Sequence, residues 1–262
     1  MTGPLGLHGG GEFMPGDERF LGALLEAAGV VATRRAAAVR VRAASSGRAS
    51  QPAAERISVV IVPTASARAG PQQKFAEGRE AIARVAARLG VEVDITEASI
   101  VDREGGSAVD FVAMLRDADL VHLPGGEPDL IPALLSGTPA AAAIDAAHRR
   151  GAVVAGASAG AMGMGVRTWT PAGWLAGLGL VRGLIVVPHF ALFDGRGWET
   201  TVESLRADGI GYLGLDERTG VLSENGNGRS TWRVSGEGRA MWFPAAGDPV
   251  TATDGETLDL DA

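Results

Sequence analysis

The sequence contains no cysteine, which excludes disulfides, thiolate metal sites and a cysteine nucleophile. The histidines are only four and lie far apart, at His8, His122, His148 and His189, so no closely spaced set predicts a zinc site. A metal held by residues distant in sequence stays open. Positive charge is also in deficit: the net charge is -7 and the isoelectric point about 5.2, which argues against a nucleic-acid partner.

Long apolar runs are missing as well. No stretch approaches the ~18 apolar residues of a membrane span, and no basic start followed by an apolar segment opens the chain. These absences predict a cytoplasmic protein with no membrane partner. At 262 residues, 46% of them hydrophobic, the chain can bury a full core. We expect residues 1–262 to form a single α/β domain, and a homodimer remains open.

Short apolar runs alternate with helical patterns along most of the chain. The alternation predicts a doubly wound, mostly parallel sheet with helices on both faces and a site at the carboxyl ends of the strands. Beyond Gly209, short strand-like pieces with turns such as 225–228 predict a small antiparallel extension at one sheet edge. The expected strands lie at 5–7, 57–62, 91–95, 120–123 and 152–155, and the expected helices at 17–25, 72–89, 108–115 and on both sides of Thr138-Pro139.

A basic, Ala- and Arg-rich insertion at about 33–56 interrupts this pattern. It has six arginines and no acidic residue before Glu55. One interpretation is a helix extension whose Val39 and Val41 touch the core, and another is an arm that extends from the domain. Charge runs are usually solvated surface, so we favour a surface insertion over contact with an anionic partner.

The most informative motif is Gly156-Ala157-Ser158-Ala159-Gly160, directly behind the apolar run 152–155. Small residues flank a serine between an expected strand and an expected helix, as in a nucleophile elbow. Glycines two before and two after the serine allow close backbone approach, and the helix start would turn N–H groups toward an oxyanion. The alternative is a strand-turn-helix that is closely packed for structural reasons only.

His189, in the segment 186–190 at the end of a strand-like run, is the candidate base for Ser158. It follows the serine by 31 residues, about one βαβ step, so its strand is expected beside the elbow strand. Gly126, from the pair that follows strand 120–123, and Ala159 are the expected backbone donors of an oxyanion hole. Of the other histidines, His8 is expected near the site, His122 as a hydrogen-bonded core residue and His148 as a solvated charge at a helix end.

Three motifs together resemble a known family. The segments Leu123-Pro124-Gly125-Gly126, Ala157-Ser158-Ala159-Gly160-Ala161 and His189-Phe190 are similar to the dipeptidase E and cyanophycinase family of serine peptidases. The runs 9–12 and 214–219 also match family-like positions. The resemblance implies the fold of the class I glutamine amidotransferases, Ser158 as nucleophile, His189 as base, Gly126 and Ala159 as oxyanion donors, and no metal or organic cofactor. The implied substrates are small peptides with peptide or isopeptide bonds next to aspartate.

The chain departs from the family pattern at several places, among them Pro188, which replaces a polar residue that often precedes the histidine. Family triads place an acid between serine and histidine, yet 159–188 contains no Asp or Glu. Glu127 follows the Gly-Gly pair where an amide or hydroxyl is common, and at the rim it would repel an aspartyl carboxylate. The arginine-rich motif after the histidine is reduced to Arg196. Glu127 and Arg196 are the expected substrate-binding residues.

Acids elsewhere in the chain could orient His189 instead. Glu217 is favoured because it closes the strand-like run 212–215. The alternatives are Asp194, Glu199, Asp216, Glu12 and a backbone carbonyl.

The missing acid also keeps a second hypothesis open, a catalytically attenuated or non-enzymatic small-molecule-binding domain on the same scaffold. An α/β-hydrolase esterase is disfavoured because no histidine follows His189. The glycines at 9–11 lack the third glycine that a dinucleotide-binding fingerprint requires.

Overall fold

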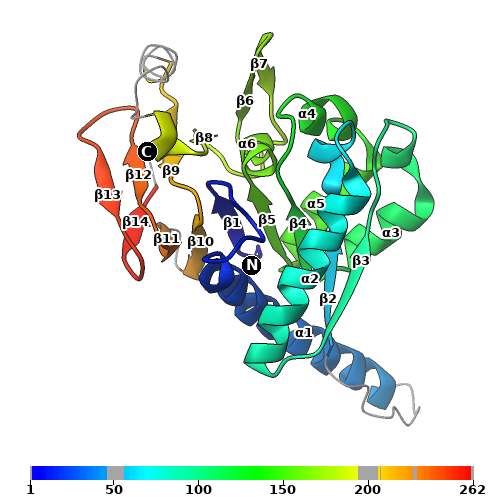
Figure 1. Cartoon of the computed structure of the whole chain (residues 1–262). Coiled ribbons are helices and arrows are strands. Elements are labelled where there is room, and N and C mark those ends of the chain that lie inside the picture. The colour runs from blue at the N-terminus through cyan, green and yellow to red at the C-terminus, as the bar shows by residue number, and fades with distance from the viewer. Residues whose placement is uncertain (1, 46–55, 194–205, 207, 227–228, 261–262) are drawn as a thin grey trace.

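The computed structural model describes residues 2–45, 56–193, 206, 208–226 and 229–260. An eight-stranded sheet forms its centre (Figure 1). In spatial order its strands are β14 (Thr257–Asp259), β11 (Arg229–Gly236), β10 (Thr219–Gly226), β1 (Leu5–His8), β5 (Val153–Ala157), β4 (Leu120–Leu123), β2 (Ile57–Ile61) and β3 (Val93–Glu97). From β1 to β3 the neighbours are parallel, and from β1 to β14 they are antiparallel. The predicted α/β class and its antiparallel extension are confirmed.

Helices cover both faces of the parallel half, as the alternation of side chains along β2 requires. Ile57, Val59 and Ile61 belong to one buried cluster with α1 (Glu18–Ser45) and α2 (Pro71–Leu89). Val60 points the other way, into a cluster with α3 (Val109–Asp117) and α5 (Pro139–Arg150). A strand that is buried on both faces needs apolar residues at every position, which explains the continuous apolar run at β2.

A second sheet of four strands covers the antiparallel half. Its order is β13 (Val250–Ala252), β12 (Ala240–Phe243), β9 (Gly211–Leu215) and β8 (Leu184–Val187). Val221 and Val234 of the main sheet share one buried cluster with Leu213 and Trp242 of this second sheet. Strands β8 and β9 are parallel, so their carboxyl ends lie side by side.

The remaining elements are short. A third sheet contains only the hairpin of β6 and β7, which lies at the top of the molecule in Figure 1. The bounds of these elements are α4 (Leu130–Leu135), α6 (Ala159–Met164), β6 (Arg167–Thr170), β7 (Gly173–Ala176) and the 3₁₀ helices η1 (Pro63–Ser66), η2 (Gly105–Ser107) and η3 (Phe190–Phe193).

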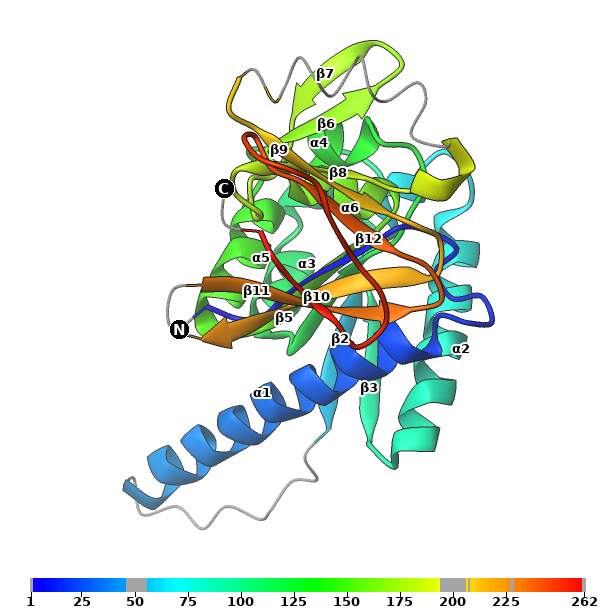
Figure 2. The same cartoon turned by 90° about the vertical axis from the view of Figure 1, so that its left-hand side faces the viewer.

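Helix α1 contains the helix extension that the sequence offers as one interpretation of the basic insertion. It continues through Ser45, into the basic insertion, and its second half projects past the sheet (Figure 2). Alanine and arginine have high helix propensity, so the helix propagates past Ala32, although none of residues 33–41 is buried. Val39 and Val41 are 57% and 69% exposed, so the part of that interpretation in which they touch the core is wrong. Residues 46–55 of the insertion lie outside the described part of the chain.

Strand β3 begins two residues later than expected. Gly90 ends α2 in a left-handed conformation, and the N–H of Val91 donates to the carbonyl of Ala86. This Schellman-type cap uses the residues that the apolar pattern places in the strand.

Among the described helices, none combines the length and the apolar composition needed to cross a membrane.

Candidate active site

Ser158 lies in a strained turn between β5 and α6. Its backbone has φ 48° and ψ -118°, and its N–H donates to the carbonyl of His8 at 2.9 Å. A Cβ added to Gly156 would lie 2.6 Å from the carbonyl carbon of Gly160, and one added to Gly160 would lie 1.9 Å from the carbonyl oxygen of Leu123. Both glycines are therefore required for the close crossing that holds the serine at the strand end.

His189 and Glu217 reach Ser158 from the second sheet. The Oγ atom of Ser158 is 2.9 Å from Nε2 of His189, and Nδ1 of His189 is 2.8 Å from Oε1 of Glu217. His189 follows β8, and Glu217 follows β9, the parallel neighbour of β8. The expectation that the histidine strand lies beside the elbow strand is wrong, because β1 and β4 already occupy both edges of β5.

The glycine-rich loop after β1 joins the two sheets at the site. The carbonyl of Gly9 accepts the N–H of His189 at 2.8 Å, and the carbonyl of Gly10 accepts the N–H of Arg218 at 2.7 Å. A Cβ on Gly10 would lie 2.2 Å from Cε1 of the His189 ring. The loop needs glycine because the imidazole packs directly on its backbone.

The five acids that could orient His189 differ in their contacts in the structure. Glu217 alone among the described candidates contacts His189. Glu12 accepts the N–H of Gly125 at 2.8 Å, and the carboxylate of Asp216 accepts hydrogen bonds from the backbone and side chain of Arg239. Asp194 and Glu199 lie outside the described residues.

The Gly125–Gly126 loop and the start of α6 supply backbone N–H groups beside the serine. A Cβ built on Gly125 would lie 3.0 Å from Cβ of Ser158, so the loop and the serine are in contact distance. Within the described part of the chain, no hydrogen bond engages the N–H of Gly126 or that of Ala159. Ala159 is the first residue of α6, where an N–H has no intrahelical acceptor.

Glu127 forms an ion pair, which sequence reasoning missed. Nη1 of Arg68 lies 2.7 Å from Oε2 of Glu127 and 3.0 Å from Oδ2 of Asp129. These hydrogen bonds raise the pKa of Arg68 above its usual value. Arg68 precedes Glu127 by 59 residues, so no local pattern could reveal the pair. Arg196, the other expected substrate contact, lies outside the described residues.

Lys74, the only lysine, forms further ion pairs that the sequence does not reveal. Its Nζ atom lies 3.7 Å from Oε1 of Glu12, the same oxygen that accepts the N–H of Gly125, and 3.1 Å from Oε2 of Glu77. Glu12 is buried, with 9% of its surface exposed. Lys74 therefore compensates the charge of a buried carboxylate that lies behind the Gly125–Gly126 loop.

The other histidines are buried or half-buried. His8 is fully buried, and its Nε2 lies 3.0 Å from Oδ1 of Asp17 without hydrogen-bond geometry. Burial lowers the pKa of His122 to about 4, and its Nδ1 has no partner among the described residues, so the expectation of a fully hydrogen-bonded side chain is wrong.

His148 is not the solvated charge that the sequence predicts. Its Nε2 lies 2.9 Å from the carbonyl oxygen of Gly3, and burial lowers its pKa.

The described residues contain no group of three or more His, Asp or Glu side chains that could hold a metal ion.

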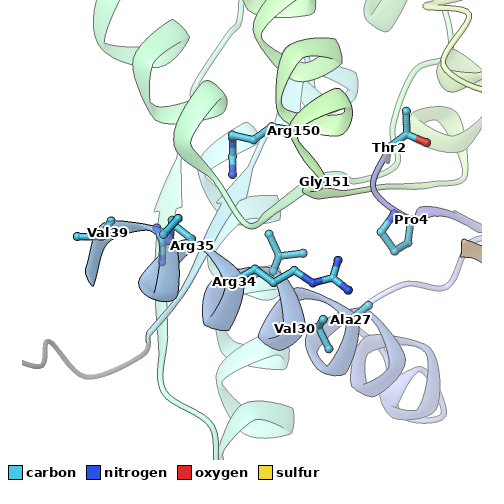
Figure 3. A pocket seen from close by; sticks show the side chains of 11 residues that line it. Thr2, Pro4, Ala27, Val30, Arg34, Arg35, Val39, Arg150 and Gly151 are labelled. Atoms are coloured by element: carbon cyan, nitrogen blue, oxygen red, sulfur yellow. The ribbon is translucent and has the colours of Figure 1, made fainter. Parts of the chain in front are cut away.

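A pocket of about 640 Å³ lies at the opposite ends of the strands (Figure 3). Pro4, which precedes β1, and Gly151, which precedes β5, line it, whereas Ser158 follows β5. Arg34 and Arg35 of α1 also line this pocket, and Arg35 pairs with the buried Asp119 at 2.9 Å. The pocket is therefore separate from the Ser158 site.

Comparison with known proteins agrees with this arrangement. The sequence profile of peptidase family S51 matches residues 49–230, more than half of the chain. The chain therefore belongs to peptidase family S51, the dipeptidase E family, and so to a family of peptidases. A search of curated proteins found no match.

Two solved structures have the same fold. One is a peptidase from an acI-B1 actinobacterium, with 24% identity, a TM-score of 0.75 and coverage of 99% of this chain and 97% of that chain. The other is a protein from Listeria monocytogenes EGD-e, provisionally named a peptidase E, with 14% identity, a TM-score of 0.54 and coverage of 91% and 100%.

Proposed function

We propose that the protein is a serine hydrolase that cleaves peptide or isopeptide bonds of small peptides. The observation that carries this proposal is the continuous chain of contacts from Oγ of Ser158 through the His189 ring to the carboxylate of Glu217. Nucleophile, base and orienting acid in that order are the parts that serine catalysis requires. Membership of a peptidase family supports the same conclusion.

In this mechanism Glu217 accepts the Nδ1–H of His189 and leaves Nε2 free to accept a proton. Nε2 removes the proton of the Ser158 hydroxyl as Oγ attacks the carbonyl carbon of the scissile bond. The N–H groups of Gly126 and Ala159 stabilise the resulting oxyanion. The protonated His189 then gives its proton to the leaving amine. In the second half of the reaction His189 deprotonates a water molecule that attacks the acyl carbon, and this proton passes to Oγ of Ser158 as the acyl group leaves.

Glu217 bears directly on the alternative of a binding domain without catalysis. That alternative rests on the absence of an acid between the serine and the histidine in sequence. Because β8 and β9 are parallel neighbours, an acid after β9 reaches the same imidazole that follows β8. The contact of 2.8 Å therefore favours a complete triad over an attenuated site.

The substrate class within this function follows from the family resemblance, which implies bonds next to aspartate. Glu127 is a proposed substrate contact at the rim, and its pairing with Arg68 weakens its repulsion of an aspartyl carboxylate. Both side chains are substantially exposed, so solvent screens the pair and a substrate can compete for the guanidinium.

The test combines labelling with turnover. A serine-directed phosphonylating probe should label Ser158 in the native protein, located by mass spectrometry, and purified protein should hydrolyse aspartyl or isoaspartyl dipeptides. Ser158→Ala should remove both signals while the protein stays folded, since loss of a serine nucleophile costs ~10⁶ in kcat. Ser136→Ala, at a serine between α4 and α5, is the matched control and should change neither signal. Peptide binding without labelling or turnover would instead support the binding domain.

A further inference from the structure

The Gly125–Gly126 loop is attached to the 3₁₀ helix η1 on both sides of Gly126. The hydroxyl of Ser66 donates to the carbonyl oxygen of Gly125 at 2.8 Å, and the N–H of Glu127 donates to the carbonyl oxygen of Ala65 at 2.7 Å. Ser66 is buried, with 4% of its surface exposed. A buried hydroxyl bond of this kind is shielded from competition by water.

The Ser66 bond fixes the direction of a neighbouring donor. The C=O of Gly125 and the N–H of Gly126 belong to one planar peptide unit, and no cis peptide occurs among the described residues. In a trans unit these two groups point in opposite directions. Holding the carbonyl toward Ser66 therefore holds the N–H of Gly126 away from Ser66. If the unit rotated, a carbonyl oxygen would replace the N–H, and it would repel an oxyanion.

Glycine makes that rotation easy, so the loop needs an external restraint. Neither Gly125 nor Gly126 has a Cβ to limit its backbone angles. Gly126 adopts φ 152°, and a Cβ there would lie 2.1 Å from the carbonyl oxygen of Ala65. The same lack of side chains that permits the close approach to η1 also leaves the peptide between the two glycines free to turn.

Glu12 restrains the other side of Gly125. Its Oε1 atom accepts the N–H of Gly125 at 2.8 Å, so the peptide units before and after Gly125 each have a partner. Lys74 lies 3.7 Å from this carboxylate oxygen and offsets its charge. The backbone of Gly125 is thus held between a buried hydroxyl and a buried carboxylate from two distant segments of the chain.

We propose that Ser66 is a positioning residue that keeps the N–H of Gly126 directed for oxyanion binding, while Glu12 holds the preceding peptide unit. This inference rests on the proposed function, because it assigns Gly126 the role of oxyanion donor. Ser66 touches no reacting atom and acts only through the Gly125–Gly126 peptide.

The test is Ser66→Ala, with steady-state kinetics and urea unfolding measured on the purified chain. We expect kcat to fall by about 10- to 100-fold with KM changed less than about 3-fold, because the donor is misdirected part of the time; complete loss of such a donor costs ~10²–10³. Ser66→Thr keeps the hydroxyl and should recover most of kcat. Ser66→Cys, whose thiol is a weak donor, should fall between Ser and Ala if threonine is too large to fold there.

Thr64→Val is the matched control. Thr64 is fully buried in the same 3₁₀ helix, and its hydroxyl donates to the carbonyl of Ile100 at 2.8 Å, away from the loop. It should lower the free energy of unfolding about as much as Ser66→Ala and leave kcat unchanged. A kcat for Ser66→Ala equal to that of Thr64→Val, or an equal fall in both, would overturn the positioning role.

The proposed function can fail separately. If Ser158→Ala abolishes turnover while Ser66→Ala has no effect on kcat, the function stands and the Ser66 inference is wrong. If the native protein shows neither labelling of Ser158 nor turnover, the function is wrong and the Ser66 inference is overturned with it.

Discussion

Replacing Glu217 by glutamine tests the acid of the proposed triad, whose role the order of residues in the chain does not reveal. The substitution keeps the size of the side chain and removes its charge. Oε1 of Glu217 lies 2.8 Å from Nδ1 of His189, so the carboxylate both selects the tautomer with Nε2 free and stabilises the imidazolium that forms when Ser158 attacks. We expect kcat to fall by about 10²- to 10³-fold.

The magnitude follows from the exposure of the pair. Two unit charges 4 Å apart interact by about 1 kcal/mol in water and about 4 kcal/mol at an effective dielectric constant of 20. The side chains of His189 and Glu217 are 30% and 38% exposed, so solvent screening places the charge effect at about 1–3 kcal/mol, or ~5- to 150-fold. A glutamine that donates its amide N–H to Nδ1 adds the cost of the wrong tautomer. Neutralising a buried triad acid costs ~10⁴, which is the upper bound.

The assay is steady-state hydrolysis of an aspartyl dipeptide together with the rate of phosphonylation of Ser158. Both rates should fall in Glu217→Gln, because both require the base, and urea unfolding should show a folded protein. Glu237→Gln is the matched control: Glu237 pairs with Arg218 on the adjacent turn at 3.3 Å and does not contact His189. A Glu217→Gln protein with kcat within about 3-fold of the native value would refute the assignment of Glu217 as the orienting acid.

Three further predictions test other parts of the molecule. Gly126→Ala should lower kcat by at least ~10²-fold, because Gly126 has φ 152° and the added methyl would collide with η1 and displace the oxyanion donor. Gly137→Ala is the control: Gly137 has φ 74°, no atom lies within 4 Å of the new Cβ, and kcat should stay unchanged. Burial lowers the pKa of His122 to about 4 from 6.5, so only the unfolded chain gains this proton as the pH falls from 6.5 to 4. The free energy of unfolding should therefore drop by up to ~3 kcal/mol over that pH range. Urea titrations of His122→Gln should show a smaller drop. Glu127→Gln leaves Arg68 with one carboxylate partner fewer and should raise kcat/KM for aspartyl over neutral peptides by ~2- to 5-fold at low salt, and an unchanged substrate profile would show that Glu127 points away from the substrate.

Local patterns in the sequence were sufficient for the parallel half of the fold and for the serine turn. The continuous apolar run at β2 encodes burial on both faces, and the glycines around Ser158 encode a crossing too close for side chains. Such signals are local because each depends on a single strand or turn and the space directly around it. The extension of α1 into the basic insertion stayed one of two interpretations, because only helix propensity favours it there.

Only the tertiary structure decided which strands bring the site together. The sequence gives no indication that β5 is already flanked by β1 and β4, so it cannot place His189 in a second sheet. Parallel pairing of β8 with β9 brings Glu217 to His189, although the acid follows the histidine by 28 residues and reverses the expected order. The contacts of Ser66 and Glu12 with Gly125 likewise join segments 59 and 113 residues apart. The sequence by itself determined the residue types and their local turns, and strand pairing, which depends on the whole buried core, decided which of them meet.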